Sequence, residues 1–284
     1  MDNKRRRKTP STPSKTPKRL PKRKRTAQTS VSAAKRALST SSSPAIELRQ
    51  RELKLYKSGQ AKCIVGCDEA GRGPLAGPVV AAACYVPADI DVLKAGLGDV
   101  HDSKAVKKED RERMYESLTT HPRIKWGACA VSAKEIDQVN ILQASMLAMH
   151  RATMALPADT QPDYVFIDGN RAPWGHERAV RSNGTIREAD PPMPSSIQTC
   201  EPVIKGDGKI FCIAAASIIA KVTRDRMMHQ LDIKYPGYNF SQHQGYPVPA
   251  HVNSIHKLKG ICPVHRLTFR PIKGSNWKVL KRFK

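Results

Sequence analysis

Two short apolar segments, separated by a loop rich in glycine and proline, set the narrowest limit on the fold. The segments are residues 61–67, which read AKCIVGC, and residues 79–86, which read VVAAACYV. The loop between them contains EAGRGPLAGP, whose three glycines and two prolines are incompatible with a regular helix. A short apolar run bounded by turn-forming residues predicts a buried strand. We therefore expect two buried strands joined by a conformationally permissive loop.

Strand-like and helix-like segments alternate along the rest of the chain. The predicted strands are residues 124–131, 164–167 and 197–204, and the predicted helices are residues 103–120, 132–156 and 210–234. Ser132 and Glu135 have the spacing of a capping box at the start of the second helix, and Pro157 ends that helix. Strands interleaved with helices predict an α/β fold, here a mixed five-stranded sheet flanked by helices.

The charge of the chain divides into two parts. Lys and Arg total 49 and Asp and Glu total 25, which gives a formal net charge of +24. Residues 1–50 hold 15 of the basic residues and only two acidic ones, so they carry +13 and leave +11 for the remainder. A segment that is this basic and this poor in large apolar residues cannot bury enough apolar surface to fold. We therefore expect residues 1–50 to be a disordered basic extension. The charge excludes a neutral globule and indicates a polyanionic partner.

The basic extension also bears on localisation. A nuclear address, an organelle transit peptide and a merely solvated arm are all compatible with a Lys-, Arg- and Ser-rich segment. A transit peptide needs an amphipathic helix, but Leu20 is the only large aliphatic residue between Asp2 and Thr29, and prolines interrupt the segment. We expect a nuclear protein, with the mitochondrion, or the cytoplasm if the arm is no targeting signal, as alternatives.

The folded part divides into a main domain and a C-terminal region. Residues 58–235 hold the predicted strands and long helices, with a surface insertion at residues 170–195 that is rich in Pro, Gly, Asn and charge. Residues 236–284 predict short helices and loops that pack on this domain. Bilayers are spanned by about 18 or more consecutive apolar residues, and no such stretch exists, so no membrane partner is expected. Seven cysteines without a Cys-x-x-Cys pair indicate reduced, buried thiols.

Acidic residues follow three of the apolar segments and lie next to glycine or a tight turn. They are Asp68 with Glu69, Asp168 and Asp207. A single such residue is commonly a turn residue or a helix cap. Strand ends at one edge of an α/β sheet converge, however, so these carboxylates would repel one another unless cations neutralised them. Oxygen-only ligands suit Mg²⁺ or Mn²⁺, and a basic protein attracts polyphosphate, so the pattern indicates metal-assisted phosphodiester hydrolysis.

Sequence motifs extend this pattern over most of the chain. The run DEAGRGPLAGPV, from Asp68 to Val79, resembles the signature of the type 2 ribonucleases H, the ribonuclease HII family. Further segments agree in order: Asp102-Ser103-Lys104, Ile167-Asp168-Gly169, Lys205-Gly206-Asp207, AAASIIAKVTRD at residues 214–225, Gly245-Tyr246-Pro247 and HRLTF at residues 265–269. The resemblance covers residues 61–272 and is closer to the single-chain bacterial form than to the catalytic subunit of the eukaryotic heterotrimer. The basic extension lies outside it, and the stretch between Asp168 and Asp207 is longer than is typical.

The resemblance implies a fold, an activity and a metal site. The fold would be ribonuclease H-like, and the C-terminal region would complete the substrate cleft. The partners would be RNA–DNA hybrids, whose RNA strand is cleaved, and duplex DNA with a single ribonucleotide, which is nicked on that unit's 5′ side, leaving 3′-hydroxyl and 5′-phosphate ends. Such an enzyme would act as a monomer in ribonucleotide removal and primer removal during replication and repair. Asp68, Glu69, Asp168 and Asp207 would be the catalytic acids and would bind two divalent cations, Mg²⁺ or Mn²⁺.

Recognition of the ribonucleotide would depend on the loop and on one tyrosine. Gly71, Arg72 and Gly73 would approach the 2′-hydroxyl closely with their backbone, and Arg72 would add charge for a phosphate. Tyr246 would stack on the deoxyribose that follows the ribonucleotide. Without the resemblance, the loop could equally be a turn that needs glycine for its conformation, and Tyr246 an ordinary surface tyrosine.

Further basic and polar residues would bind the phosphate backbone. Ser103 and Lys104 lie at the start of a predicted helix, where free N–H groups favour an anion, although Ser103 could simply cap that helix. Lys221 and Arg224 would face the nucleic acid from a long packed helix, and Asp225 would orient Arg224 or a loop.

Two other hypotheses remain open from the sequence. One is a non-catalytic protein that binds RNA–DNA hybrids, against which the four intact carboxylates argue, because acids that face phosphate weaken binding. The other is a catalytic subunit that needs accessory chains.

Overall fold

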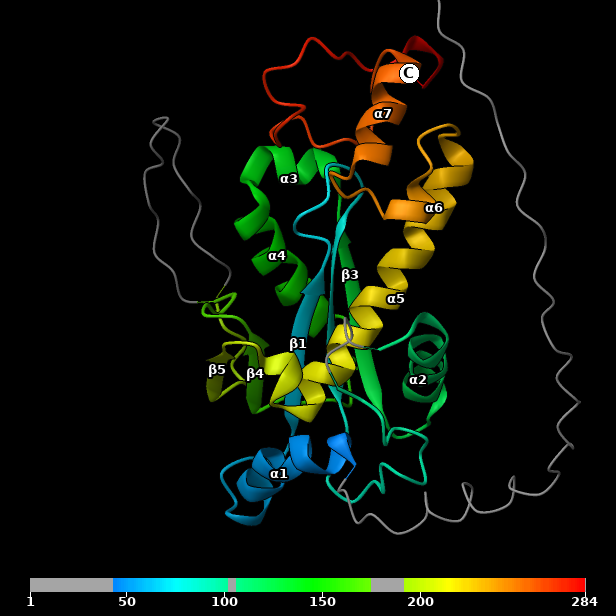
Figure 1. Cartoon of the computed structure of the whole chain (residues 1–284). Helices are drawn as coiled ribbons and strands as arrows, with labels where there is room; N and C mark the ends of the chain where they lie inside the picture. The colour runs from blue at the N-terminus through cyan, green and yellow to red at the C-terminus, as the bar shows by residue number, and fades with distance from the viewer. Residues whose placement is uncertain (1–42, 102–105, 175–191, 284) are drawn as a thin grey trace, which may run out of the picture. The chain divides into compact units, whose positions relative to one another are not determined.

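The computed structural model describes residues 43–101, 106–174 and 192–283 (Figure 1). Residues Ser42–Lys284 form one compact unit. Most of the predicted basic extension, and residues 175–191 of the predicted insertion, lie outside the described residues. The predicted end of the extension at residue 50 differs from the structure, because helix α1 (Pro44–Lys57) begins within it. The predicted surface insertion also begins differently, since Trp174 is buried and donates a hydrogen bond to His150 Nδ1 at 2.9 Å.

The predicted mixed five-stranded sheet is confirmed. Its strands are β1 (Ile64–Ala70), β2 (Val79–Tyr85), β3 (Lys125–Val131), β4 (Tyr164–Asp168) and β5 (Thr199–Val203). Their spatial order is β3-β2-β1-β4-β5, in which the first three are antiparallel neighbours and β1, β4 and β5 run parallel. Because parallel strands end at the same edge, the residues that follow β1, β4 and β5 are brought together there.

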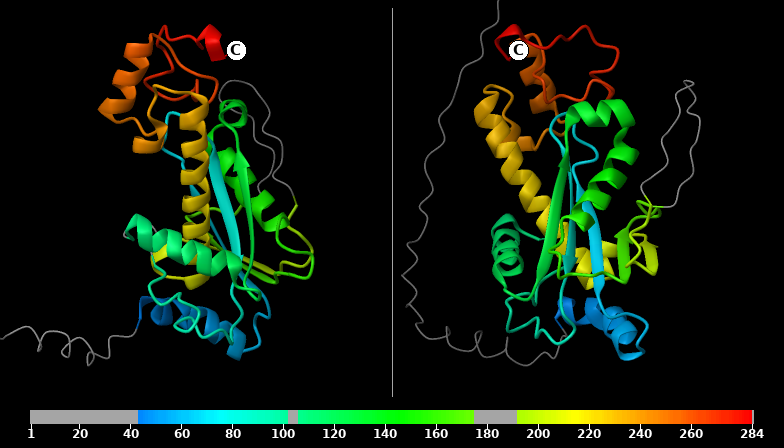
Figure 2. Two further views of the ribbon diagram at one scale, coloured as in Figure 1. Left: turned by 90° about the vertical axis from the view of Figure 1, so that its right-hand side faces the viewer. Right: turned by 180° about the vertical axis from the view of Figure 1, so that it is seen from behind.

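Helices cover both faces of the sheet (Figures 1 and 2). Helix α5 (Phe211–Lys234) packs on one face with α2 (Lys108–Thr120), and α4 (Ile141–Met154) packs on the other. The alternation of strand side chains explains this division: Val65 and Cys67 lie in the core beneath α4, whereas Gly66 faces α5. A Cβ atom at Gly66 would lie 2.2 Å from the backbone carbon of Cys212, so glycine allows α5 to cross β1 closely.

The predicted helix at residues 132–156 is two helices. The capping box of Ser132 and Glu135 opens α3 (Ala133–Val139) as expected, but the chain turns at Asn140 before α4 begins. Asn140 has φ 73°, and its side-chain oxygen accepts from Leu142 N at 3.0 Å and Gln143 N at 3.1 Å. Local capping by this asparagine therefore interrupts a helical pattern that continues in the sequence.

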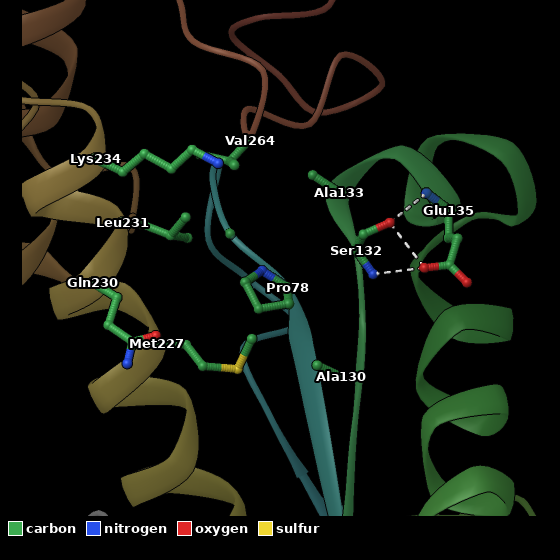
Figure 3. A pocket seen from close by; sticks show the side chains of 11 residues that line it. Pro78, Ala130, Ser132, Ala133, Glu135, Met227, Gln230, Leu231, Lys234 and Val264 are labelled. Atoms are coloured by element: carbon green, nitrogen blue, oxygen red, sulfur yellow. Dashed lines mark hydrogen bonds between the residues drawn. The ribbon is translucent and has the colours of Figure 1, made fainter.

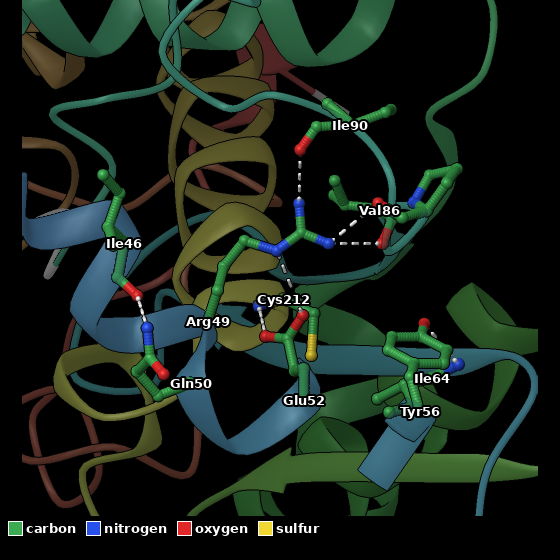
Figure 4. A network of polar contacts seen from close by, with 10 residues as sticks. Ile46, Arg49, Gln50, Glu52, Tyr56, Ile64, Val86, Ile90 and Cys212 are labelled. Atoms are coloured by element: carbon green, nitrogen blue, oxygen red, sulfur yellow. Dashed lines mark hydrogen bonds and ion pairs between the residues drawn. The ribbon is translucent and has the colours of Figure 1, made fainter. Parts of the chain in front are cut away.

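Helix α1 is anchored beneath the sheet by two buried charged side chains (Figure 4). Arg49 donates to the carbonyl oxygens of Pro87 at 2.8 Å, Val86 at 3.1 Å and Ile90 at 3.3 Å. Glu52 accepts from Cys212 N at 2.7 Å in the first turn of α5, and burial raises the pKa of its carboxyl to about 7. Together these bonds join α1 to the start of α5 and to the chain that follows β2.

The C-terminal region lies at the end of the sheet where β1 passes into β2 (Figures 1 and 2). Its helices are α6 (Phe240–His243) and α7 (Pro249–Leu258), followed by the short 3₁₀ helix η3 (Lys281–Phe283). Tyr238, Phe240 and Ile255 form a separate apolar cluster with Leu75 from the loop between β1 and β2. This cluster fixes the C-terminal region against the loop that carries the predicted recognition residues.

Two further expectations concern the chain as a whole. No helix in the described part of the chain is long and apolar enough to cross a membrane. All seven cysteines are free thiols in the structure.

Candidate active site

Asp68 and Glu69 lie within β1, not beyond its end. The sequence suggested a strand that stops at residue 67, but β1 continues through Ala70 and pairs Asp68 with Ala82 and Glu69 with Ala81. Asp68 is only 4% exposed and lies on the face covered by α5. Strand pairing therefore fixes the backbone from which both carboxylates extend.

Asp168 and Asp207 reach the same place from the neighbouring strands. Asp168 is the last residue of β4, and its Oδ1 accepts from Gly206 N at 2.6 Å. Asp207 belongs to the 3₁₀ turn η2 (Gly206–Gly208), which follows a left-handed residue, Lys205 with φ 55°. The tight turn after β5 thus places a second acid beside the end of β4.

The four carboxylates influence one another electrostatically. Burial raises the pKa of Asp68, and the charges of Glu69, Asp168 and Asp207 raise it further, against a hydrogen bond from Ser217. Burial also raises the pKa of Glu69, which Arg72 opposes through an ion pair of 3.2 Å. Such a cluster favours either shared protons or a bound cation.

The donor chemistry fits a hard divalent cation. All four side chains offer carboxylate oxygens, the ligands that Mg²⁺ and Mn²⁺ prefer. Within the described ranges, no three His, Cys, Asp or Glu side chains lie in an arrangement already closed enough to hold a metal ion. The acids therefore fit the cation by the type of their donor atoms and by their mutual electrostatic influence.

A cleft of about 340 Å³ opens above three of these acids. It is lined by Asp68, Glu69, Ala70, Gly71, Arg72, Gly73, Asp168, Ser217, Lys221, Arg224 and Tyr246. Most of the residues predicted from the sequence therefore share one cavity. Asp207 is buried and is not among the lining residues, and Ser103 and Lys104 lie outside the described residues.

Two of the three glycines of the loop, Gly71 and Gly73, face residues from distant parts of the chain. A Cβ atom at Gly71, which has φ +96°, would lie 2.0 Å from Arg224 Nε. A Cβ atom at Gly73 would lie 3.4 Å from the Tyr246 ring. Glycine is thus required at residue 71 by both its conformation and its neighbour.

Arg224 does not face the nucleic acid as expected. Its side chain is 1% exposed and donates to the carbonyl oxygens of Pro78 at 3.0 Å, Gln244 at 3.1 Å and Ala76 at 3.3 Å. Burial lowers the pKa of the guanidinium to about 10. Arg224 joins the loop after β1 to the chain after α6 because a buried cation must spend its donors on protein acceptors.

Lys221 lines the cleft and pairs with Asp225, for which the sequence suggested a different partner. Its Nζ lies 2.6 Å from Asp225 Oδ1, one helical turn further along α5. Burial lowers the pKa of the Lys221 amine, which Asp225 opposes. Asp225 therefore orients Lys221, whereas the sequence suggested Arg224 or a loop.

Tyr246 is positioned through a chain of histidines. Its side chain is 41% exposed, while its carbonyl oxygen lies 3.0 Å from His251 Nδ1, which must donate. His251 Nε2 then accepts from His265 Nε2 at 3.2 Å, and His265 Nδ1 accepts from Cys262 N at 3.1 Å. This pattern needs neutral imidazoles, and burial lowers the pKa of His251 to about 4 and of His265 to about 3.

A second cavity, of about 360 Å³, lies between α5 and the ends of β2 and β3 (Figure 3). Its single acidic side chain, Glu135, accepts from Ser132 N at 3.0 Å and pairs with Arg151 at 3.0 Å. The other walls are mainly apolar, including Met227, Leu231 and Val264. This cavity lacks the acid cluster, so the chemistry belongs to the first cleft.

The sheet order, with clustered acids where β1, β4 and β5 end, defines a nuclease of the ribonuclease H-like class. Ribonuclease H2 from Pyrococcus horikoshii has this fold, with a TM-score of 0.53 and 25% identity over 74% of this chain and 95% of that protein. The family model "Ribonuclease HII" matches residues 65–271. The chain belongs to the ribonuclease HII family.

Bacterial relatives support this assignment over most of their length. Ribonuclease HII of Magnetococcus marinus is 45% identical over 231 residues, which cover 81% of this chain and 94% of the relative. Ribonuclease HII of Listeria monocytogenes serotype 4a is 41% identical over 230 residues, or 81% of this chain and 76% of the relative. The fold is shared by Bst ribonuclease HIII, solved in complex with Mn²⁺, at a TM-score of 0.50 and 18% identity over 74% of this chain and 68% of that one.

The resemblance inferred from the motifs is therefore confirmed, and the chain is a ribonuclease H enzyme that acts on RNA–DNA hybrids. This assignment rules out the alternative of a non-catalytic binder. The expected nuclear localisation is wrong, because the relatives named above are bacterial proteins and bacteria have no nucleus. The basic segment was the sole basis for that expectation, and a basic segment attracts nucleic acid in any compartment.

Proposed function

We propose that this ribonuclease cleaves the RNA strand of hybrids and also nicks duplex DNA on the 5′ side of a single ribonucleotide. Water attacks the phosphorus, the bond from phosphorus to the 3′ oxygen breaks, and that oxygen takes a proton. The products are a 3′-hydroxyl on the upstream nucleotide and a 5′-phosphate on the ribonucleotide. The observation that carries the proposal is that three of the acids, Asp68, Glu69 and Asp168, line one cleft together with the glycine-containing loop.

Asp68, Glu69, Asp168 and Asp207 are proposed as the catalytic acids. Their oxygen ligands would hold two Mg²⁺ or Mn²⁺ ions, which would supply Lewis-acid activation of the water and of the leaving oxygen. The carboxylates repel one another in the folded protein, so their arrangement is primed to accept positive charge. The Mn²⁺ complex of the structurally similar ribonuclease HIII agrees with this choice of ion.

The walls of the cleft are proposed to read the substrate. Backbone groups of Gly71, Arg72 and Gly73 would contact the 2′-hydroxyl, which alone distinguishes a ribonucleotide from its neighbours. The exposed Tyr246 ring would stack on the following deoxyribose, and Lys221 would contact a phosphate.

Ser103 and Lys104 are proposed to bind phosphate as well. Residues 58–235 are proposed as the catalytic domain and residues 236–284 as the region that completes the cleft through Tyr246.

We propose a monomer, for which the sedimentation of the purified chain is the test. An active monomer would also exclude a need for accessory chains. The biological role typical of the family is ribonucleotide and primer removal in replication and repair.

The test is a DNA duplex with one internal ribonucleotide and a labelled 5′ end. Incubation with Mg²⁺ or Mn²⁺ should give one nick on the 5′ side of the ribonucleotide, and the upstream product should be extendable by a polymerase because it ends in a 3′-hydroxyl. An all-DNA duplex of the same sequence should stay intact, and EDTA should stop the reaction. A nick on the other side, or none, would refute the proposal.

A further inference from the structure

The loop between β1 and β2 is held by a second buried arginine, Arg266, from the C-terminal region. Its side chain is 0% exposed and its three nitrogens all donate to this loop. Nη2 donates to the Gly71 carbonyl at 2.7 Å, Nη1 to the Arg72 carbonyl at 2.9 Å and Nε to the Gly77 carbonyl at 3.0 Å. One guanidinium therefore fixes both ends of the segment from residue 71 to residue 77.

Burying this cation is costly, so its retention needs a reason. Burial, together with the nearby charge of Arg224, lowers the pKa of Arg266 to about 9. A well-packed apolar side chain usually fills a buried position at lower cost than an ion does. Unlike an apolar side chain, a guanidinium orients the carbonyl groups that it binds, because its donors lie in a fixed plane.

The orientation of those carbonyls decides where the backbone N–H groups point. In a trans peptide the C=O and the N–H of the same plane point in opposite directions. Because the carbonyls of Gly71 and Arg72 point to Arg266, the N–H groups of Arg72 and Gly73 point away from it. Among the described residues neither N–H has a protein acceptor, which leaves two adjacent donors for an oxygen atom in the cleft.

Packing holds only part of this loop. Leu75 and Ala76 are buried in the apolar cluster of the C-terminal region, whereas Arg72 and Gly73 are exposed. The peptide planes of the exposed part have no side-chain packing to fix them. Directed hydrogen bonds must therefore supply the restraint there.

The segment that carries Arg266 is itself anchored at both ends. Arg266 N donates to the Leu75 carbonyl at 2.8 Å. Asp137 of α3 accepts from Leu267 N at 2.8 Å and from Thr268 N at 2.9 Å. Arg266 is thus connected rigidly to the flank of the catalytic sheet.

We infer that Arg266 is a positioning residue for ribose recognition, which orients the N–H groups of Arg72 and Gly73 toward the 2′-hydroxyl. This inference rests on the proposed function of the loop and names the residue that maintains it. Arg266 is buried and touches no substrate, so its effect is transmitted through the peptide planes that it binds.

The test compares the affinities of full-length protein for two duplexes of one sequence, one all-DNA and one with a single ribonucleotide. Measurement with Ca²⁺ as the only divalent ion reports binding under conditions chosen to suppress cleavage. The ratio of the two Kd values is the ribose preference. We expect Arg266→Lys, which keeps the charge but not the three-way fork, to reduce that preference by about tenfold, the value of one well-formed hydrogen bond. Its Kd for all-DNA should stay within about twofold, since phosphate contacts are unchanged.

Arg49→Lys is the matched control. Arg49 is also buried and also donates to three backbone carbonyls, but far from the cleft, at Val86, Pro87 and Ile90. A purely structural role of Arg266 would give both variants a lower Tm and the same ribose preference as the wild type, and this result would overturn the inference. If Arg266→Lys does not fold, Asp137→Ala, which frees only the neighbouring segment, should still lower the preference, and an unchanged ratio would overturn the inference.

The wild type separates this inference from the proposed function. A wild type without ribose preference would refute the proposed recognition by the loop. A wild type with that preference and an equally selective Arg266→Lys variant would refute only the role of Arg266.

Discussion

Replacement of Gly71 by alanine should destabilise the protein well beyond the cost of its unusual backbone conformation. Gly71 has φ +96°, and a Cβ atom there would lie 2.0 Å from Nε and 2.4 Å from Cδ of Arg224. Because the clash involves the buried stem of the side chain, the guanidinium must move. It then loses bonds to the carbonyl oxygens of Ala76, Pro78 and Gln244.

The magnitude follows from two contributions. The left-handed conformation costs an alanine about 1–2 kcal/mol. Each buried hydrogen bond from a charged donor is worth about 1.5–3 kcal/mol, so loss of only one brings the total to about 2.5–5 kcal/mol. Domains of this kind are stable by about 5–15 kcal/mol, so Gly71→Ala should remain folded at low temperature but unfold much more readily.

Urea denaturation followed by circular dichroism measures this effect. The matched control is Gly274→Ala, because Gly274 has φ +89° and a Cβ atom there would meet no atom of the described residues within 4 Å. The control should lose about 1–2 kcal/mol from conformation alone. Equal losses of unfolding free energy in the two variants would show that the Arg224 side chain can move without destabilising the protein. This result would refute the role of Arg224 as a fixed support of the loop.

Two further predictions concern Tyr246 and the histidines behind it. Tyr246→Ala should weaken the preference for single ribonucleotides over long hybrids, while Tyr246→Phe keeps it, as measured by kcat/KM on both substrates; an equal loss on both would contradict stacking. In the folded protein, burial lowers the pKa of His251 to about 4 and of His265 to about 3, whereas the unfolded chain protonates both near pH 6.5. The contribution of this pair to the free energy of unfolding is therefore fully present above pH 6.5 and is lost as pH falls toward 4. Urea titrations should show a loss of up to about 2.7 kcal/mol per pH unit in this window, smaller in His251→Gln, and an identical loss in the variant would exclude the pair as its source.

The sheet and the positions of the acids were predictable because they depend on local patterns. Apolar runs bounded by Gly and Pro identify β1, β2 and β4, and acids at the ends of such runs identify Asp168. The continuation of β1 through Asp68 and Glu69 was not predictable, because these polar residues end the apolar pattern. Pairing with Ala81 and Ala82 of β2 carries the strand further, and that pairing is set by the neighbouring strand.

Buried charged residues account for most of the remaining differences. Arg49 lies within the segment that was expected to be solvated, and Glu52 lies just after it, yet both are buried. A backbone carbonyl far along the chain accepts from Arg49, and a backbone N–H far along the chain donates to Glu52. Arg224 was expected to face the nucleic acid, and instead donates to a carbonyl of the loop after β1, as Arg266 also does. Long-range backbone partners leave no signal in the local sequence, which is why a charged residue is misread as exposed.

The carboxylates of β1, β4 and the turn after β5 are proposed to perform the cleavage. The direct measurement is the single-turnover rate of nicking at one ribonucleotide in Mg²⁺, alongside the Kd for the same duplex. Asp68→Asn should slow nicking by at least about 100-fold with little change in Kd, and Asp168→Asn and Asp207→Asn should behave alike. Glu52→Gln, which neutralises a buried carboxylate outside the cleft, should nick at a rate near that of the wild type. Retained turnover in Asp68→Asn, or an equal loss in Glu52→Gln, would contradict the assignment.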